Sequence, residues 1–385
     1  MTPLRGIRVL DLSRLLPGPW ASLMLNDLGA EVIKIENPEH ADDVRGFGPI
    51  VQGHSALHHL LNRGKKSMTL NLKHDDGRKL FLQLVETADV VLESFRPGVL
   101  EGLQLDFDHL RQANAQIVLC SLTGYGQTGP RSHEAGHDIN YIGYAGILGL
   151  NGNGDRVPIV PSVPIADLAG GSMAVIAILA GLWARQSTQV AQWIDVAMLD
   201  GVFTWLPVLI AENLRPGGVD QQTGVLSGGY ACYTTYPTQD GRFMCVGALE
   251  PKFWLTFCRA LKVLEFVGQQ FAPMDRQQEM KTVIAEIFLA HSQAYWIERF
   301  ADVEACCTPV LTVSEALRER ELDTRAMVDT KTKIPDFGQP FRWIGTEEVP
   351  IDTRTRRLGE DTANILAQIG VTPKHLQVLK ERGTV

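Results

Sequence analysis

Short hydrophobic runs alternate with amphipathic stretches along the N-terminal third of the chain. The runs are rich in Val, Ile and Leu, which is typical of buried strands, and the stretches between them have helical patterning. Because parallel strands need crossover connections, the alternation predicts an α/β fold with a mostly parallel sheet and helices on both faces. The predicted strands are 7–12, 31–35, 68–72, 89–92 and 117–122, and the predicted helices are 20–28, 77–87 and 107–113.

The loops after Leu12, Leu92 and Leu122 form the expected ligand-binding edge, since ligands bind beyond the carboxyl ends of strands in such sheets. The turn at 13–19, which includes Pro17-Gly18-Pro19, lacks the G-x-G-x-x-G pattern of dinucleotide sites. A dinucleotide cofactor is therefore not expected.

A glycine-rich stretch at 211–229 predicts a boundary between two domains. A smaller α+β domain is expected after it, with strands at 231–236 and 242–246 and helices near 253–261 and 282–290. The chain then becomes irregular before a last predicted helix at about 361–369.

The composition narrows the range of partners. A net charge of −8 argues against nucleic acid and against an anionic membrane surface. Six cysteines without C-x-x-C spacing fit a reducing cytoplasm, and the N-terminus runs into a strand without the pattern of a signal peptide. The apolar run at 168–184 contains three glycines and a serine, so we interpret it as a buried core helix rather than a membrane span.

Asp167 precedes this apolar helix in the segment Asp167-Leu168-Ala169-Gly170-Gly171-Ser172. Taken alone, an aspartate in this place is more often an N-cap than a catalytic group. The paired glycines favour the second interpretation, because they are poor helix formers and let a ligand approach the backbone. A carboxylate beside free N–H groups is a candidate nucleophile or base with its own oxyanion hole.

Two further segments carry candidate acid–base groups. His137 lies in the segment 136–141, after a glycine-rich loop at 123–130, where it could exchange protons near neutral pH or simply cap a helix. Glu250 could orient the histidine ring, although its position before a proline is also typical of a helix start.

Other patterns give weaker signals. His54, His58 and His59 have spacing that could hold zinc on a helix, but no third ligand accompanies them, so no metal is expected. The segment 63–67 ends like a P-loop but lacks its first glycine, which leaves only a possible phosphate contact. Arg96 follows a strand, where it could bind a phosphate or carboxylate.

Together these segments resemble the class III CoA-transferase superfamily, also called the CaiB/BaiF family, which includes the α-methylacyl-CoA racemases. The resemblance runs over nearly the whole chain. It implies a large Rossmann-like domain from residues 1–210, to which 316–385 return, a small α+β domain at 225–315, and an interlocked homodimer. It implies no metal or redox cofactor. Coenzyme A itself is part of the substrate. The matching segments are 4–12, 28–34, 62–67, 95–99, 192–201 and 358–362.

The resemblance implies two alternative reactions. In the transferases the aspartate that matches Asp167 attacks the acyl thioester and becomes an aspartyl-CoA thioester. In the racemases the matching aspartate and a histidine exchange the C2 proton through an enolate. The segments around His137 and Glu250 resemble racemases, so we expect a 2-methylacyl-CoA racemase with Asp167, His137 and Glu250 as its catalytic residues. A CoA-transferase is the alternative, and a non-catalytic acyl-CoA-binding protein is a third possibility.

The same resemblance implies where coenzyme A and the acyl group bind. Two positions depart from the family pattern, because Gly102 and Asn37 stand where relatives carry basic residues. The segment 38–61 is longer than in typical racemases, so Arg45 or its histidines could supply replacement contacts. The residues expected to bind substrate are Leu70, Asn71, Leu72, Lys73, Ser94, Phe95, Arg96, Gly136, Asp138, Ile139, Asn140 and Tyr141.

Overall fold

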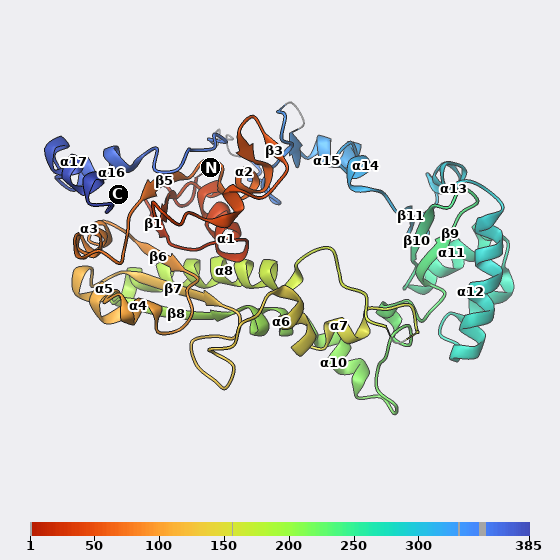
Figure 1. The fold of residues 1–385 in the computed structure, drawn as a ribbon. Coiled ribbons are helices and arrows are strands. Elements are labelled where there is room, and N and C mark those ends of the chain that lie inside the picture. Colours follow the sequence, from red (N-terminus) through yellow and green to blue (C-terminus); the bar gives the residue numbers. More distant parts are fainter. Residues whose placement is uncertain (1, 156, 330–331, 346–351) are drawn as a thin grey trace. The chain divides into compact units, whose positions relative to one another are not determined.

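The computed structural model describes residues 2–155, 157–329, 332–345 and 352–385 (Figure 1). The chain divides into two compact units, each treated separately below. The first comprises 1–142, 163–205 and 320–385, and the second comprises 143–162 and 206–319. The segment 143–162 clusters with the second unit, although the sequence suggested that it would belong to the first.

The first unit is built on a six-stranded sheet in which every paired strand is parallel, in the order β5-β2-β1-β6-β7-β8. The alternation of apolar runs and helices therefore correctly predicted a parallel sheet. The strand β8 was missed, because Gln192 and Asp195 interrupt its apolar residues and most of the strand is only partly buried or exposed. The strands are β1 (Arg8–Asp11), β2 (Glu31–Glu36), β5 (Lys66–Thr69), β6 (Val90–Glu93), β7 (Val118–Thr123) and β8 (Gln192–Ala197).

Helices cover both faces of this sheet. On one face α3 (Asp75–Val85), α5 (Phe107–Ala113), α16 (Thr362–Gln368) and α17 (Pro373–Glu381) share a hydrophobic core with the strands. On the other face α1 (Pro17–Asp27) packs against α8 (Ile165–Thr188). The expected turn at Pro17–Pro19 is instead the first turn of α1, where a proline is tolerated because its missing N–H would have no helical partner.

The helix α8 passes close to its neighbours through its glycines. A Cβ at Gly170 would lie 2.5 Å from Met198 Cγ, and one at Gly171 would lie 2.6 Å from the Pro17 carbonyl oxygen. Glycine is therefore needed there for close helix packing. By length and composition α8 could span a membrane, but half of its apolar window is buried within the chain, and the core helices of folded proteins pass the same test.

The second unit contains a three-stranded antiparallel sheet in the order β11-β10-β9. Its strands are β9 (Tyr233–Pro237), β10 (Phe243–Gly247) and β11 (Cys307–Pro309). The helices α11 (Pro251–Leu261), α12 (Met274–Leu289) and α13 (Gln293–Phe300) pack on it through an aromatic core that includes Trp254, Phe257 and Phe288. The predicted α+β character of this part is confirmed.

Shorter elements complete the described chain. In the first unit they are η1 (Asp43–Arg45), β3 (Ile50–Val51), β4 (His54–Ser55), α2 (Ala56–Asn62), α4 (Val99–Gly102), α6 (Asp138–Tyr144), α9 (Met198–Phe203), α15 (Arg320–Thr324), β12 (Val328–Asp329) and β13 (Asp336–Phe337), with the end of α6 extending into the second. In the second they are α7 (Ile147–Leu150), α10 (Pro207–Asn213), η2 (Val225–Ser227), η3 (Leu264–Gln269) and α14 (Val313–Ala316).

Candidate active site

Asp167 lies in the first turn of α8, and another carboxylate caps that helix. The N-cap position is Pro164, and Asp167 makes no capping hydrogen bond. Instead, Asp138 Oδ1 accepts the backbone N–H groups of Ala166 and Asp167 at 2.6 and 3.2 Å. The interpretation of Asp167 as the N-cap is therefore wrong, because Asp138, at the start of α6, accepts the N–H groups at the start of α8. The side chain of Asp167 is left for other contacts.

The surroundings of Asp167 raise the pKa of its carboxyl group, so this group is protonated more easily than an ordinary aspartate. Burial, with a smaller contribution from the negative charge of Asp138, raises the pKa of Asp167 from its usual 3.8 to about 6. A group that titrates close to neutral pH can both accept and return a proton at that pH. Perturbed carboxylates of this kind are enriched at catalytic sites.

The expected oxyanion hole after Asp167 is not formed by the backbone in this structure. The N–H groups of Ala166 and Asp167 donate to Asp138, and that of Leu168 donates to the Pro164 carbonyl at 3.1 Å. The glycines that follow are packed against neighbouring helices, so they do not offer a ligand close approach. These donors are occupied because the helix and its cap use them.

His137 lies on the surface immediately before α6 and is held through its backbone. Its N–H donates to Asn140 Oδ1 at 3.0 Å, while the Asn140 N–H donates to the His137 carbonyl at 2.8 Å. The next residue, Asp138, is bonded to the start of α8, so the structure brings the chain at His137 to the same small region as Asp167. The imidazole is exposed and therefore open to a substrate.

The rest of the segment 136–141 is fixed by Tyr141. Its hydroxyl donates to the Gly136 carbonyl at 2.6 Å, and its ring meets Tyr125 edge-on at 5.1 Å between centroids. Burial raises the pKa of Tyr141 to about 12, with smaller contributions from the charge of Asp167 and others. Tyr141 is therefore a neutral hydrogen-bond donor that holds the loop in place, whereas Ile139 is exposed.

Glu250 lies in the second unit, at the N-cap position of α11 and directly before Pro251. Its side chain is exposed and does not cap the helix. Its local role as a helix-start residue is thus confirmed. The pairing of Glu250 with His137 stays a prediction, because the two residues belong to different units.

Four of the residues expected to bind coenzyme A line one cavity of about 250 Å³ in the first unit, at the carboxyl ends of β1, β2 and β5. Its walls are mostly apolar, and a few polar and charged side chains are among the lining residues, which is typical of a small-molecule site. The expected residues are Leu70, Leu72, Lys73 and Phe95, and the others are Leu12, Arg14, Ile35, Glu36, Asn37, His40, Asp42, Val99 and Leu103. We call it the nucleotide pocket.

Three other residues expected to bind substrate are not among the residues that line this pocket. Asn71 is buried, donates its N–H to the Thr384 carbonyl at 2.8 Å and accepts the Lys73 N–H at 3.1 Å, so it holds the C-terminus and the turn. Ser94 Oγ accepts the backbone N–H of Arg14 at 3.2 Å. Arg96 lines a separate cavity of about 610 Å³ on the other side of the β6–α4 loop.

Glu93 forms part of the wall of this second cavity and was missed by sequence reasoning. The residue is only 2% exposed, and its Oε2 accepts the Phe95 N–H at 2.7 Å. Burial raises its pKa to about 7, although hydrogen bonds from Ser121 and the Phe95 amide act in the opposite direction. The signal was an acidic residue at the end of a fully apolar strand, directly before Ser94-Phe95-Arg96.

The P-loop-like segment makes no surface phosphate site. Lys65 is 2% exposed, and its ammonium group donates to Ser22 Oγ at 2.7 Å, to Asn62 Oδ1 at 2.9 Å and to Asp11 Oδ2 at 3.5 Å. Burial lowers its pKa to about 7, despite the opposing charge of Asp11. Lys65 is therefore too deeply buried to bind a phosphate at the surface, and a phosphate contact from the rest of the segment 63–67 stays a prediction.

Most of the side chains in 38–61 that were expected to contact coenzyme A interact with other residues of the chain or are buried. Arg45 is ion-paired with Glu36, with one nitrogen–oxygen distance of 2.8 Å, and Nδ1 of His59 lies 2.5 Å from Thr355 Oγ1. Burial lowers the pKa of His58 to about 2, so it is neutral. Of these histidines, His40 reaches the nucleotide pocket. Within the described ranges, no group of three or more potential metal ligands comes together.

The fold is that of solved CaiB/BaiF proteins. It matches the crystal structure of a CaiB/BaiF family protein from Brucella suis with a TM-score of 0.84 at 31% sequence identity, covering 96% of this chain and 99% of that one. The chain belongs to CoA-transferase family III, whose model matches residues 4–362.

Relatives with two different activities are almost equally similar. An alpha-methylacyl-CoA racemase of Mus musculus is 34% identical over 97% of this chain and 95% of its own length. A succinyl-CoA:glutarate CoA-transferase of Mus musculus is 32% identical over 84% of this chain and 75% of its own. The protein is therefore an enzyme of an acyl-CoA family whose members carry out both reactions.

Proposed function

We propose that the enzyme inverts C2 of a 2-methylacyl-CoA thioester by removing a proton from one face and returning one to the other. The observation that carries the proposal is the position of Asp167, half-buried at the start of α8, where Asp138 bonds the segment of the exposed His137 to this helix, and burial raises the pKa of Asp167 to about 6. A simple nucleophile gains from a low pKa, because it must be ionised, whereas a group that alternates between base and acid works best when it titrates near the working pH. Asp167 fits the second role.

The reaction needs two proton-transfer groups on opposite sides of C2. Asp167 accepts the C2 proton, the electron pair of the C–H bond moves toward the thioester oxygen, and the resulting enolate takes a proton at C2 from His137. In the reverse direction the two groups exchange roles. The exposed imidazole before α6 and the half-buried carboxyl group in α8 supply these functions, and Glu250 is proposed to orient the imidazole.

Coenzyme A is proposed to bind in the nucleotide pocket. Apolar walls of Leu70, Leu72 and Phe95 suit a flat base, and Lys73 suits a phosphate. Arg96 lines the separate cavity of about 610 Å³. Its guanidinium group is proposed to bind a phosphate of coenzyme A away from C2.

The racemase and the transferase are distinguished by what happens to Asp167. Incubation of the enzyme with a 2-methylacyl-CoA in deuterated water should label C2 and racemise it, without a lasting adduct on the protein. A transferase would instead build an aspartyl-CoA thioester that hydroxylamine or borohydride traps on Asp167. The second outcome would favour the alternative reaction, which the 32% identical transferase relative supports. No turnover and no exchange with a panel of thioesters would favour a non-catalytic binding protein.

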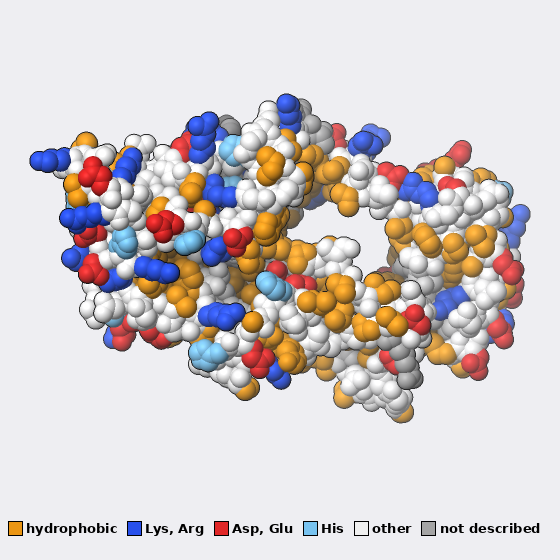
Figure 2. Space-filling view, in the orientation of Figure 1, with side chains coloured by type: hydrophobic (Ala, Val, Ile, Leu, Met, Phe, Trp, Pro, Cys, Tyr) orange, Lys and Arg blue, Asp and Glu red, His pale blue; other side chains and the backbone are white. Residues whose placement is uncertain are grey.

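We also propose a homodimer of interlocked chains, active in the cytoplasm with no further cofactor and with no nucleic acid or membrane as partner. Many hydrophobic side chains reach the surface of the single chain (Figure 2). On α8, β8 and α9 of the first unit they include Ile176, Trp183, Trp193 and Phe203, which are 47–75% exposed. Apolar surface of this extent is typical of a protein interface. Sedimentation of a fully active monomer would contradict the dimer.

A further inference from the structure

The loop between β1 and α1 contains a backbone conformation that its residue type disfavours. Leu15 has φ of +65°, in the left-handed region that bulky side chains rarely occupy. Such a residue persists only where its surroundings hold it, and these positions cluster at functional sites. The loop follows Leu12, which lines the nucleotide pocket, and hydrogen bonds from buried charged residues hold it in this conformation.

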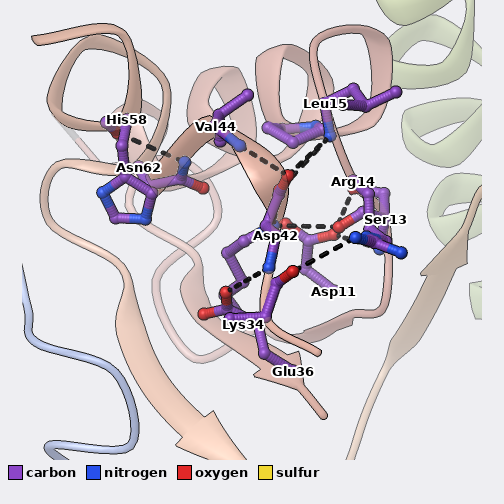
Figure 3. Close-up of polar contacts among 12 residues, drawn as sticks. Asp11, Ser13, Arg14, Leu15, Lys34, Glu36, Asp42, Val44, His58 and Asn62 are labelled. Atoms are coloured by element: carbon purple, nitrogen blue, oxygen red, sulfur yellow. Dashed lines mark hydrogen bonds and ion pairs between the residues drawn. The ribbon is translucent and has the colours of Figure 1, made fainter. Parts of the chain in front are cut away.

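Two buried ion-paired residues hold the loop on both sides of Arg14 (Figure 3). Asp42 accepts the Leu15 N–H with both carboxylate oxygens, at 3.1 and 3.3 Å. Lys34 donates to the Ser13 carbonyl at 2.9 Å and pairs with Asp42 at the same distance. Asp11 accepts the Ser13 N–H at 2.9 Å. The backbone just before and just after Arg14 is thus fixed by charged side chains.

The pair Lys34–Asp42 is almost completely buried. The two side chains are 2% and 0% exposed, respectively. A buried ion pair is weak evidence for stability, because desolvation of both charges offsets their attraction, and its best-attested use is to specify one geometry. In this protein the geometry that it specifies is the Ser13–Leu15 backbone.

Arg14 is the side chain that this geometry presents. It lines the nucleotide pocket, and its Nη2 donates to the Ala41 carbonyl at 3.1 Å and to Asp43 at 3.2 Å. The side chains of Arg14 and Asp43 are 43% and 65% exposed, so their ion pair is weak and easily exchanged for a stronger anion.

The charges around the pocket leave a surplus of basic groups. Its two acidic residues, Glu36 and Asp42, are matched by Arg45 and Lys34, which are their ion-pair partners. The basic side chains of Arg14, Lys73 and His40 face the same cavity, whereas Asp43, the exposed ion-pair partner of Arg14, is not among its lining residues. This balance suits a ligand with phosphate groups.

We propose that Asp42, paired with Lys34, is a positioning residue that sets Arg14 as a phosphate contact for coenzyme A. The inference rests on the proposed function, since it takes coenzyme A as the ligand of the nucleotide pocket. It also accounts for the neutral residues Asn37 and Gly102, which stand where basic phosphate contacts were expected from the resemblance. Arg14 provides a cation at the pocket that does not depend on either position.

The test is a double-mutant cycle with coenzyme A titrated calorimetrically into the full-length enzyme. Arg14→Ala should weaken binding about tenfold, the size expected for one charge-assisted phosphate contact. Asp42→Ala should weaken it to a similar extent, and the double variant should be no worse than the weaker single variant within about twofold. The turnover of saturating acyl-CoA should remain close to wild type, because the contact lies away from C2.

Dephospho-CoA identifies which phosphate is bound. If Arg14→Ala weakens coenzyme A but leaves dephospho-CoA unchanged, the contact is the 3′-phosphate, and equal losses with both ligands indicate the pyrophosphate. Either result supports the phosphate contact. If Asp42→Ala does not fold, Asp42→Asn carries the same test, since it also removes the ion pair with Lys34.

Asp27→Asn is the matched control. Asp27 pairs with Arg63 at 2.7 Å, both side chains are less than 10% exposed, and neither lines the nucleotide pocket. This variant should lose stability and keep its affinity for coenzyme A. Additive losses in the double variant, or full affinity in Asp42→Ala, would overturn the inference alone. Failure of the wild type to bind coenzyme A would overturn the proposed function and the inference with it.

Discussion

Two carboxylates of the first unit, the buried Asp11 and the half-buried Asp167, are placed in opposite surroundings. Burial alone acts to raise the pKa of Asp11, yet the charges of Lys65 and Lys34, together with hydroxyl donors, leave it below its usual value. Burial raises the pKa of Asp167 to about 6, and its charged neighbour Asp138 acts in the same direction. Asp11 therefore stays ionised and holds a backbone, whereas Asp167 changes its protonation near neutral pH.

The difference shows how one fold uses the same residue type for structure and for chemistry. A carboxylate surrounded by lysines and hydroxyl groups has a fixed charge, so it can fix geometry. A carboxylate beside another carboxylate has a variable charge, so it can transfer protons.

Loss of Lys34 should have the largest effect on stability. Lys34→Met would leave Asp42 and Asp11 without their shared cation in a buried site, and removal of one partner of such a pair costs about 3–5 kcal/mol. Urea unfolding of the full-length enzyme measures the change. Lys66→Met is the control, because Lys66 pairs with Glu31 in a partly exposed position and should cost no more than about 1 kcal/mol. Equal losses in the two variants would contradict a special role for the buried network.

Acidic pH should slow proton removal by Asp167. The carboxylate must be ionised to accept a proton, so exchange of the C2 proton that faces Asp167 should fall by about tenfold per pH unit below the pKa, which burial raises to about 6. Deuterium incorporation into each enantiomer between pH 4.5 and 8 measures this limb. Its persistence in Asp167→Asn would show that another group is responsible.

Truncation of Arg96 should affect binding more than chemistry. Arg96→Ala should raise KM for an acyl-CoA by about tenfold and change kcat little, because a phosphate contact far from C2 acts equally on the ground state and the transition state. Initial rates over a range of substrate concentrations separate the two constants. A large loss of kcat with unchanged KM would instead place Arg96 at the reacting atoms.

Replacement of Asp167 should stabilise the protein slightly while it removes activity. Its folded-state pKa is raised from 3.8 to about 6, so the stability linked to its proton is fully present below about pH 4 and is lost as pH rises through 6. At neutral pH the ionised group is therefore unfavourable, and Asp167→Asn should gain about 1 kcal/mol after allowance for its partial exposure. Thermal unfolding should show the gain at pH 7.5 and lose it at pH 4.

The sequence contained enough information for most of the sheet. Apolar runs predicted β1, β2, β6 and β7 closely, and the cavity-lining residues Leu12 and Phe95 lie just after β1 and β6, where the strand-end rule predicted a ligand-binding edge. The edge strand β8 was missed because Gln192 and Asp195 interrupt its apolar residues, so it lacks the continuous apolar run of the central strands. Local patterns report burial and periodicity, and these were sufficient for the core of the sheet.

Contacts between distant residues were beyond local patterns. Asp138 caps α8 by binding the N–H groups of Ala166 and Asp167, which are 28 and 29 positions further along the chain. The sequence around Asp167 gave no sign of this distant partner, so Asp167 itself resembled the N-cap residue. Lys65 is buried beside Asp11, which is 54 positions away in the sequence. The local P-loop-like motif could not reveal this burial. The raised pKa of Glu93 likewise follows from tertiary burial rather than from its neighbours in sequence.

The most direct test of the account is one-sided exchange by His137→Gln and Asp167→Asn, measured separately in deuterated water with both enantiomers of a 2-methylacyl-CoA. Each variant should racemise at least about a hundredfold more slowly, because each loses proton transfer on one face. Each should also exchange deuterium into one enantiomer with retention, and the two variants should prefer opposite enantiomers. Full activity of His137→Gln together with abolished acyl transfer in Asp167→Asn would contradict the racemase and establish the transferase.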